Sequence, residues 1–126
     1  MSMFTGAEWN VKRKAEWVEI RSLKGRPVYI FANLPLDYEK GLDSVAQLHL
    51  QQYLEKNKLE PGITIHRGHS YWVGSTIRNL APSSKIVILG SCGGFHNLDD
   101  VLKTCPDAHI ISSKEVGTRI INEPIL

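Results

Sequence analysis

A chain of 126 residues is long enough to bury one apolar core and too short for two, so we expect residues 1–126 to form a single domain. Hydrophobic residues make up 42% and charged residues 22% of the chain, a composition that excludes disordered and fibrous proteins. The formal charge of +2 is small and its basic residues are mixed with acidic ones, so no nucleic-acid partner is expected.

The cysteines and apolar runs exclude two further classes of protein. Cys92 and Cys105 are too few for a disulfide framework. No apolar run reaches the length of a membrane span, and Met1-Ser2-Met3 does not begin a signal peptide. Because so bland a start also suits the terminal domain of a longer protein, the sequence leaves both the cellular compartment and the oligomeric state open.

A helix over residues 7–23 is the first expected element. Most of its apolar residues would share one helical face, with the basic residues on the other: Trp9, Ala15, Trp17 and Ile20. We expect this face to pack its tryptophans on a sheet. A turn over residues 24–27 then precedes the first expected strand, over residues 28–32.

A loop and a second helix follow this strand. Pro35 has no backbone donor, so residues 33–37 are expected to leave the strand as a loop. If all strands are parallel, this loop lies at the edge where the other strands end. Asn33 and Asp37 are therefore candidates for the wall of a binding cleft. An apolar stripe then predicts a helix over residues 44–57.

Two apolar, β-branched runs come next, and each ends in small or polar residues. Residues 63–66 are expected to form a strand followed by Arg67-Gly68-His69-Ser70. Residues 85–89 are expected to form another, buried on both faces and followed by Gly90-Ser91-Cys92-Gly93-Gly94. A helix over residues 71–80 makes a right-handed crossover between them, as adjacent parallel strands require. A thiol and an imidazole would then meet at one edge of the sheet.

The rest of the chain predicts two helices and one strand. Asn97 is expected to cap a short helix over residues 98–104, with Asp99 near its positive end. A fourth strand over residues 108–111 precedes a last helix over residues 115–121. The whole pattern indicates an α/β three-layer sandwich with a mostly parallel sheet.

The two strand ends carry the groups needed for nucleophilic catalysis. Cysteine attacks a carbonyl carbon as its thiolate, which a neighbouring base or cation stabilises. His69 is favoured over His66 as the base, because the base must lie just past the strand end to reach its neighbour. Glycine-rich backbone would hold the developing oxyanion, with three candidates: Gly68, Ser70 and Gly93. Further candidates for the cleft wall are His66, His96 and Asp99.

This order of parts resembles the catalytic core of the clan CD cysteine peptidases, which include caspases, gingipains, clostripain, legumain and separase. The resemblance is best over residues 62–94 and extends more loosely over residues 28–111. It implies a caspase-like, Rossmann-like sheet with Cys92 as nucleophile and His69 as base, and no cofactor. It also implies a peptide or protein substrate, cleaved through a thioester. The family usually has glycine directly after its histidine, whereas this chain has Gly68 before it and Ser70 after it.

Three other interpretations stay open. In the first, the domain is catalytically inactive and Cys92 is a small buried residue in a strand-to-helix turn, as free cysteines most often are. In the second, nitrogen and sulfur ligands hold zinc: His66, His69, Cys92 and His96. In the third, the glycine-rich turn holds a phosphate or another anion, although it lacks the Lys-Ser/Thr ending of a P-loop.

Overall fold

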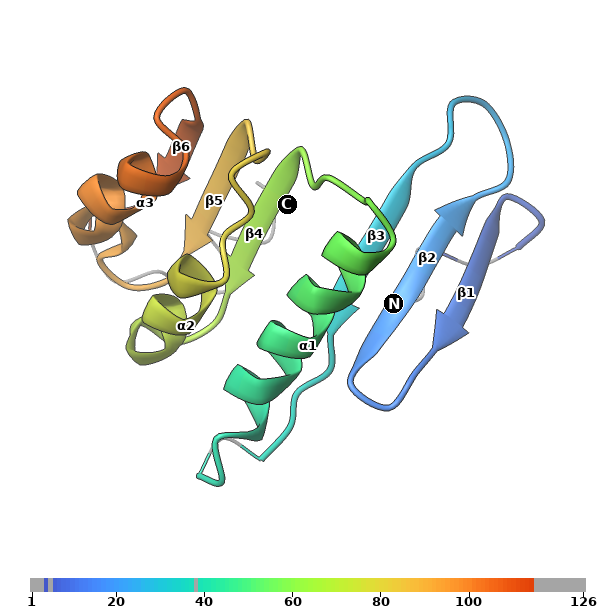
Figure 1. The fold of residues 1–126 in the computed structure, drawn as a ribbon, viewed down its shortest axis with the longest axis horizontal. Helices are drawn as coiled ribbons and strands as arrows, with labels where there is room; N and C mark the ends of the chain where they lie inside the picture. The colour runs from blue at the N-terminus through green and yellow to red at the C-terminus, as the bar shows by residue number, and fades with distance from the viewer. Residues whose placement is uncertain (1–3, 5, 38, 115–126) are drawn as a thin grey trace. The chain divides into compact units, whose positions relative to one another are not determined.

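The computed structural model describes residues 4, 6–37 and 39–114, which divide between two compact units (Figure 1). The first unit ends at Leu50 and the second begins at Gln51, so helix α1 (Leu42–Lys56) contributes to both. The helix expected over residues 115–121 lies outside the described residues. Within the described ranges, no helix has the length and apolar character needed to cross a membrane.

The first unit contains an antiparallel sheet of three strands, in the order β1 (Trp9–Arg13), β2 (Trp17–Ser22) and β3 (Tyr29–Asn33). The helix predicted over residues 7–23 is therefore wrong. Val18 and Ile20 are buried from one face of β2, whereas Glu19 between them faces the other way. This alternation of period two, in a run rich in aromatic and β-branched residues, favours a strand.

Strand β3 corresponds to the strand predicted over residues 28–32, but it lies in a different kind of sheet. It pairs antiparallel with β2, and the core beside it contains Val18, Ile20 and Leu34. The premise that all strands are parallel is therefore wrong. Asn33 and Asp37 were expected at the edge where the parallel strands end only because of this premise, so the reason for placing them there is lost.

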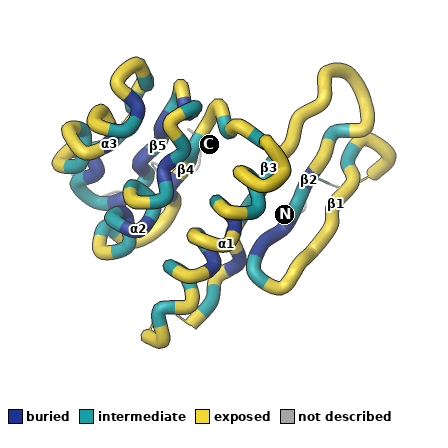
Figure 2. The backbone as a smooth tube through the Cα atoms, viewed as in Figure 1, coloured by how far each residue is buried: buried dark blue, intermediate teal, exposed yellow. Residues whose placement is uncertain are grey.

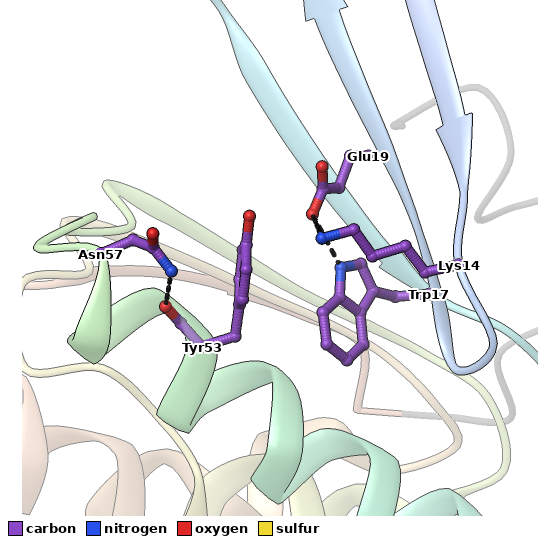
Figure 3. Close-up of polar contacts among 5 residues, drawn as sticks. All are labelled: Lys14, Trp17, Glu19, Tyr53 and Asn57. Carbon is purple, nitrogen blue, oxygen red and sulfur yellow. Dashed lines mark hydrogen bonds and ion pairs between the residues drawn. The ribbon is translucent and has the colours of Figure 1, made fainter.

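The other face of β2 carries a small polar cluster (Figure 3). Lys14 Nζ lies 2.6 Å from a carboxylate oxygen of Glu19, and Trp17 Nε1 donates to the same oxygen across 3.2 Å. The Lys14 ammonium also lies 5.5 Å from the centroid of the Trp17 ring, within the range of a cation–π interaction. Trp17 is thus held on this strand by a neighbouring carboxylate and ammonium.

Helix α1 confirms the helix predicted over residues 44–57. Near its start, Asp43 Oδ1 accepts the backbone N–H of Leu36 across 2.8 Å, which ties the preceding loop to the first turn. At its end, Asn57 Nδ2 donates to the carbonyl of Tyr53 across 2.7 Å (Figure 3). Lys58 then takes a positive φ of 54°, which ends the helix.

The second unit contains a parallel sheet of three strands, in the order β4 (Ile63–Arg67), β5 (Ile86–Gly90) and β6 (His109–Ser112). The strands predicted over residues 63–66, 85–89 and 108–111 are confirmed to within one residue, and so is the parallel pairing of the first two. Helix α2 (Val73–Arg78) connects β4 to β5, and helix α3 (Leu98–Thr104) connects β5 to β6. A 3-10 turn precedes each helix: η1 (Ser70–Trp72) and η2 (Gly94–Asn97).

Both connecting helices pack on one face of the parallel sheet. Val87 and Leu89 of β5 are each 1% exposed, and they share a core with Val73 of α2 and Val101 of α3. Figure 2 shows buried positions along β5 in dark blue. When both crossover helices lie on one face of a sheet, they leave its opposite face for other elements to cover. The buried side of β5 therefore depends on these two helices.

The described residues cover the opposite face of the same sheet only in part. Ile63 and Ile65 of β4 are 56% and 50% exposed, and Ile86 and Ile88 of β5 are intermediate in exposure. Since these residues alternate with the buried ones along each strand, they form one apolar face. Strand β5 is therefore fully buried on one face, whereas burial on both was predicted.

Candidate active site

Strands β4 and β5 end level with each other. Their parallel ladder runs from the pair Ile63 and Ile86 to the pair Arg67 and Gly90. His69 follows Arg67 by two residues, and Cys92 follows Gly90 by two residues. The register therefore places the loop that carries the imidazole and the loop that carries the thiol at the same edge of the sheet, as the sequence predicted.

Two glycines shape the turn that contains Cys92. Gly93 has a φ of 62°, in the left-handed region that residues with a Cβ rarely adopt. A Cβ on Gly94 would lie 2.8 Å from the carbonyl oxygen of Leu89, so only glycine fits against β5 at that position. The Gly94 N–H donates to the carbonyl of Ser91 across 3.3 Å. Cys92 lies inside this turn as a partly exposed thiol outside any disulfide.

The residue after β6 braces the same turn. Ser113 Oγ donates to the carbonyl of Ser91 across 3.2 Å, and the N–H of Phe95 donates to the carbonyl of Ser113 across 3.2 Å. Sequence analysis missed Ser113. Its position follows from the order β4-β5-β6, because the third strand ends beside the second at the same edge. The sequence predicted that strand but not which strand it would lie beside.

His69 is exposed and precedes the 3-10 turn η1 as its N-cap. Its Nδ1 accepts the N–H of Tyr71 across 3.2 Å, and its carbonyl accepts the N–H of Trp72 across 3.0 Å. Because Nδ1 accepts a hydrogen bond, the proton of the neutral ring is on Nε2. Nε2–H can therefore donate to a thiolate, whereas the lone pair that would accept a proton is at Nδ1, so His69 has to open the bond from Tyr71 when it acts as a base.

His66 lies in the interior, 7% exposed, and does not line an open cleft. Its Nδ1 lies 2.8 Å from Thr76 Oγ1 of α2, and its Nε2 has no hydrogen-bond partner among the described residues. Burial lowers the pKa of His66, and the backbone of His69 opposes this with a smaller rise. A buried neutral ring is poorly placed to exchange protons with substrate, which favours His69 as the base.

Two further candidates for the cleft wall, His96 and Asp99, lie on different elements after β5. His96 is exposed within η2, and Asp99 is exposed in the first turn of α3. Asn97 occupies the N-cap position of α3 but makes no side-chain capping bond, so its predicted capping role is wrong. Two exposed aromatic residues that the sequence analysis did not single out also follow these strands: Tyr71 and Phe95, 77% and 41% exposed.

The zinc interpretation finds no support in the geometry. In the described part of the chain, no three side chains of His, Cys, Asp or Glu gather closely enough to hold a metal ion. His66 is turned into the core toward Thr76, whereas His69 lies on the exposed loop. The four residues considered as zinc ligands therefore do not form a metal centre.

The arrangement at this edge suits acyl transfer. It combines a partly exposed thiol on one loop with an exposed imidazole on the next. The N–H of Gly93 makes no hydrogen bond within the described residues, so it is available to a developing negative charge.

Comparison with protein-family models, curated proteins and solved structures finds no match to this chain.

Proposed function

We propose that this protein is a cysteine peptidase-like domain that hydrolyses peptide bonds with a dyad of Cys92 and His69. The observation that supports it most is the register of β4 and β5, which sets both residues two positions beyond the last strand pair. The proposal includes a caspase-like, three-layer sandwich around the parallel sheet. Because a parallel sheet is normally covered on both faces, the third layer of this proposal would lie over the half-exposed side chains of Ile63 and Ile65.

The dyad would act in two steps on a peptide or protein substrate. The Cys92 thiolate forms a bond from sulfur to the scissile carbonyl carbon, and the carbon–nitrogen bond breaks to leave a thioester. His69 holds the thiol proton and gives it to the departing amine. Water then attacks the thioester, with His69 accepting its proton, and the thiol is regenerated. No other reactant is needed.

The turn after β5 would stabilise the charge that develops on the carbonyl oxygen. Gly93 presents its N–H without a Cβ in the way, in a conformation that its positive φ fixes. Gly68 and Ser70 flank His69 and would supply the facing side of the oxyanion site. Backbone donors held in this way need no reorganisation when the charge forms.

Competition between the two cysteines for iodoacetamide tests the proposal in one sample. Cys105 is 2% exposed, and its Sγ donates to the carbonyl of Ala81 across 3.3 Å. Burial raises the pKa of the Cys105 thiol, which makes it a poor nucleophile. We expect Cys92, whose thiol is partly exposed, to be alkylated at least about tenfold faster than Cys105.

Two histidine variants give this experiment its matched control. His69→Ala is expected to slow the alkylation of Cys92, whereas His109→Ala, at an exposed histidine that begins β6, is expected to leave that rate unchanged. Cleavage of a mixed peptide library would then be lost in Cys92→Ala and His69→Ala alone. Equal, slow labelling of both cysteines in the native protein would instead favour the catalytically inactive domain.

A further inference from the structure

The buried ring of His66 lies directly beneath the loop that carries His69. A Cβ on Gly68 would stand 3.6 Å from both Cε1 and Nε2 of the His66 ring, so a side chain at this position would contact the ring and the Gly68 backbone lies on this side of it. The Nδ1 side of the ring is occupied by Thr76 Oγ1 at 2.8 Å. The loop therefore rests on the Nε2 side of an imidazole whose other side is fixed to α2.

If both ring nitrogens of His66 carried a proton, the Nε2–H would need a hydrogen-bond acceptor. Nε2 is buried and has no hydrogen-bond partner among the described residues. The neighbouring acceptor is the carbonyl of His69, since the backbone of His69 favours the protonated ring. That carbonyl already accepts the N–H of Trp72 across 3.0 Å, the bond that closes η1. The oxygen could accept a second hydrogen bond, but none joins it to Nε2 in this structure, so a second proton on His66 would require the loop to move.

We propose that His66 is a positioning residue whose neutral ring supports the loop of Gly68 and His69, and that a second proton on this ring displaces the loop. The inference rests on the proposed function, because it makes the alignment of His69 with Cys92 depend on the state of His66. A single buried group would then switch the dyad off in acid.

Burial is the dominant influence on the pKa of His66, whatever the groups around its ring. Strand β5 faces His66 through its register partner Leu89, and α2 faces it through Thr76. The charged or titratable side chains on the adjoining segments are exposed: Arg67, His69 and Arg78. Within the described residues none of them shifts the pKa of His66, which burial lowers from its ordinary value of 6.5.

The first test follows backbone amide resonances of the full chain during a pH titration. We use a His69→Asn background, which removes the second imidazole from this loop while the asparagine still accepts at the N-cap. The amides of Gly68 and Trp72 are expected to shift together with the His66 ring, at a midpoint below 6.5. His66→Gln, which keeps a polar group for Thr76, is expected to abolish this step.

Thr76→Val supplies a second variant in case His66→Gln does not fold. It removes the partner of the Nδ1–H, so the doubly protonated ring becomes less favourable and the step should move to lower pH. A matched His109→Gln change at the start of β6 should leave the step in place. Loop amides that do not follow the His66 ring, or a step that survives His66→Gln, would overturn the inference.

The alkylation rate of Cys92 separates this inference from the proposed function. With His69 present, the rate should fall about tenfold per pH unit where one proton blocks the thiolate, and by up to about a hundredfold per unit while His66 takes up its proton, until only the reactivity of an unactivated thiol remains. His66→Gln should restore the shallower slope. An unchanged slope with fast labelling refutes the loop switch alone, whereas slow labelling at every pH beside an intact amide step refutes the dyad alone.

Discussion

The imidazole of His69 accepts a hydrogen bond at Nδ1 from the N–H of Tyr71, across 3.2 Å. This bond makes the proposed base an N-cap of the 3-10 turn that follows it. An imidazolium has a proton on both nitrogens and cannot accept at Nδ1. Formation of the proposed thiolate–imidazolium pair with Cys92 would therefore release the Tyr71 N–H, which would couple the start of η1 to the charge of the His69 ring.

Two substitutions separate the capping role of His69 from its chemical role. His69→Asn keeps a side-chain oxygen that can accept the Tyr71 N–H, whereas His69→Ala does not. Because a lost N-cap costs about 0.5–2 kcal/mol, His69→Ala should lower the free energy of unfolding toward the low end of that range, and His69→Asn should not. Chemical denaturation measures this difference.

Both variants should lose the rapid alkylation of Cys92 to the same degree, since neither retains an imidazole. A His69→Asn protein that keeps fast labelling would show that the ring does not activate the thiol. Equal unfolding free energies for the two variants would show that the Tyr71 contact adds nothing to stability.

The turn after β5 should tolerate no side chain at Gly94. A Cβ there would meet the Leu89 carbonyl oxygen at 2.8 Å and the Leu89 Cβ at 2.9 Å, both on the rigid central strand. Gly94→Ala should destabilise the protein by about 1–3 kcal/mol, as other overpacked sites do. Thermal unfolding of this variant beside Gly62→Ala tests the expectation, because Gly62 has nothing within 4 Å of its Cβ position. Equal melting temperatures for the two variants would contradict the close packing.

Glu19 should contribute a small, salt-dependent part of the stability of the first unit. In Glu19→Gln the Lys14 ion pair is lost, while the side-chain oxygen still accepts from Trp17 Nε1. The pair is partly buried, so the loss should be at most about 1 kcal/mol at low salt and smaller at high salt. Glu8→Gln, which breaks a more exposed pair with Lys24, is the control and should change stability less. A larger loss in the control would reverse this ranking.

The sequence predicts the second unit well because its local and long-range signals agree. Short β-branched runs flanked by glycine and serine mark β4 and β5, and the length between them allows a helical crossover. The register follows almost directly, so the shared edge of His69 and Cys92 could be inferred from residue order. The side-chain hydrogen bonds could not, because the bond from Tyr71 to His69 depends on how tightly the loop turns.

The first unit shows where such reasoning fails. Trp9 and Trp17 fit one face of a helix by spacing, but only four apolar residues carried that pattern. Strand pairing decided the outcome, since Val18 and Ile20 are buried together with residues more distant along the chain, such as Leu34. Helical periodicity in a short segment carries less information than the contacts that a sheet brings from elsewhere.

The stability of the protein should fall in mild acid through His66. Burial lowers the pKa of His66 in the folded protein below its ordinary value of 6.5. As the pH falls below that value, the unfolded chain takes up a proton before the folded protein does, so the free energy of unfolding decreases. One group contributes a slope of at most about 1.4 kcal/mol per pH unit, and the slope vanishes once the pH is below the folded pKa.

The difference between the native protein and His66→Gln isolates this contribution, because carboxylates and the other histidines titrate equally in both. Urea unfolding between pH 7.5 and pH 4.5, about the range in which histidine titrates, should show the native protein losing its stability advantage as the pH falls. A difference that stays constant with pH would mean that His66 is protonated equally in both states. A difference that grows in acid would mean that the charged ring is stabilised in the folded protein, the reverse of what its buried Nε2 predicts.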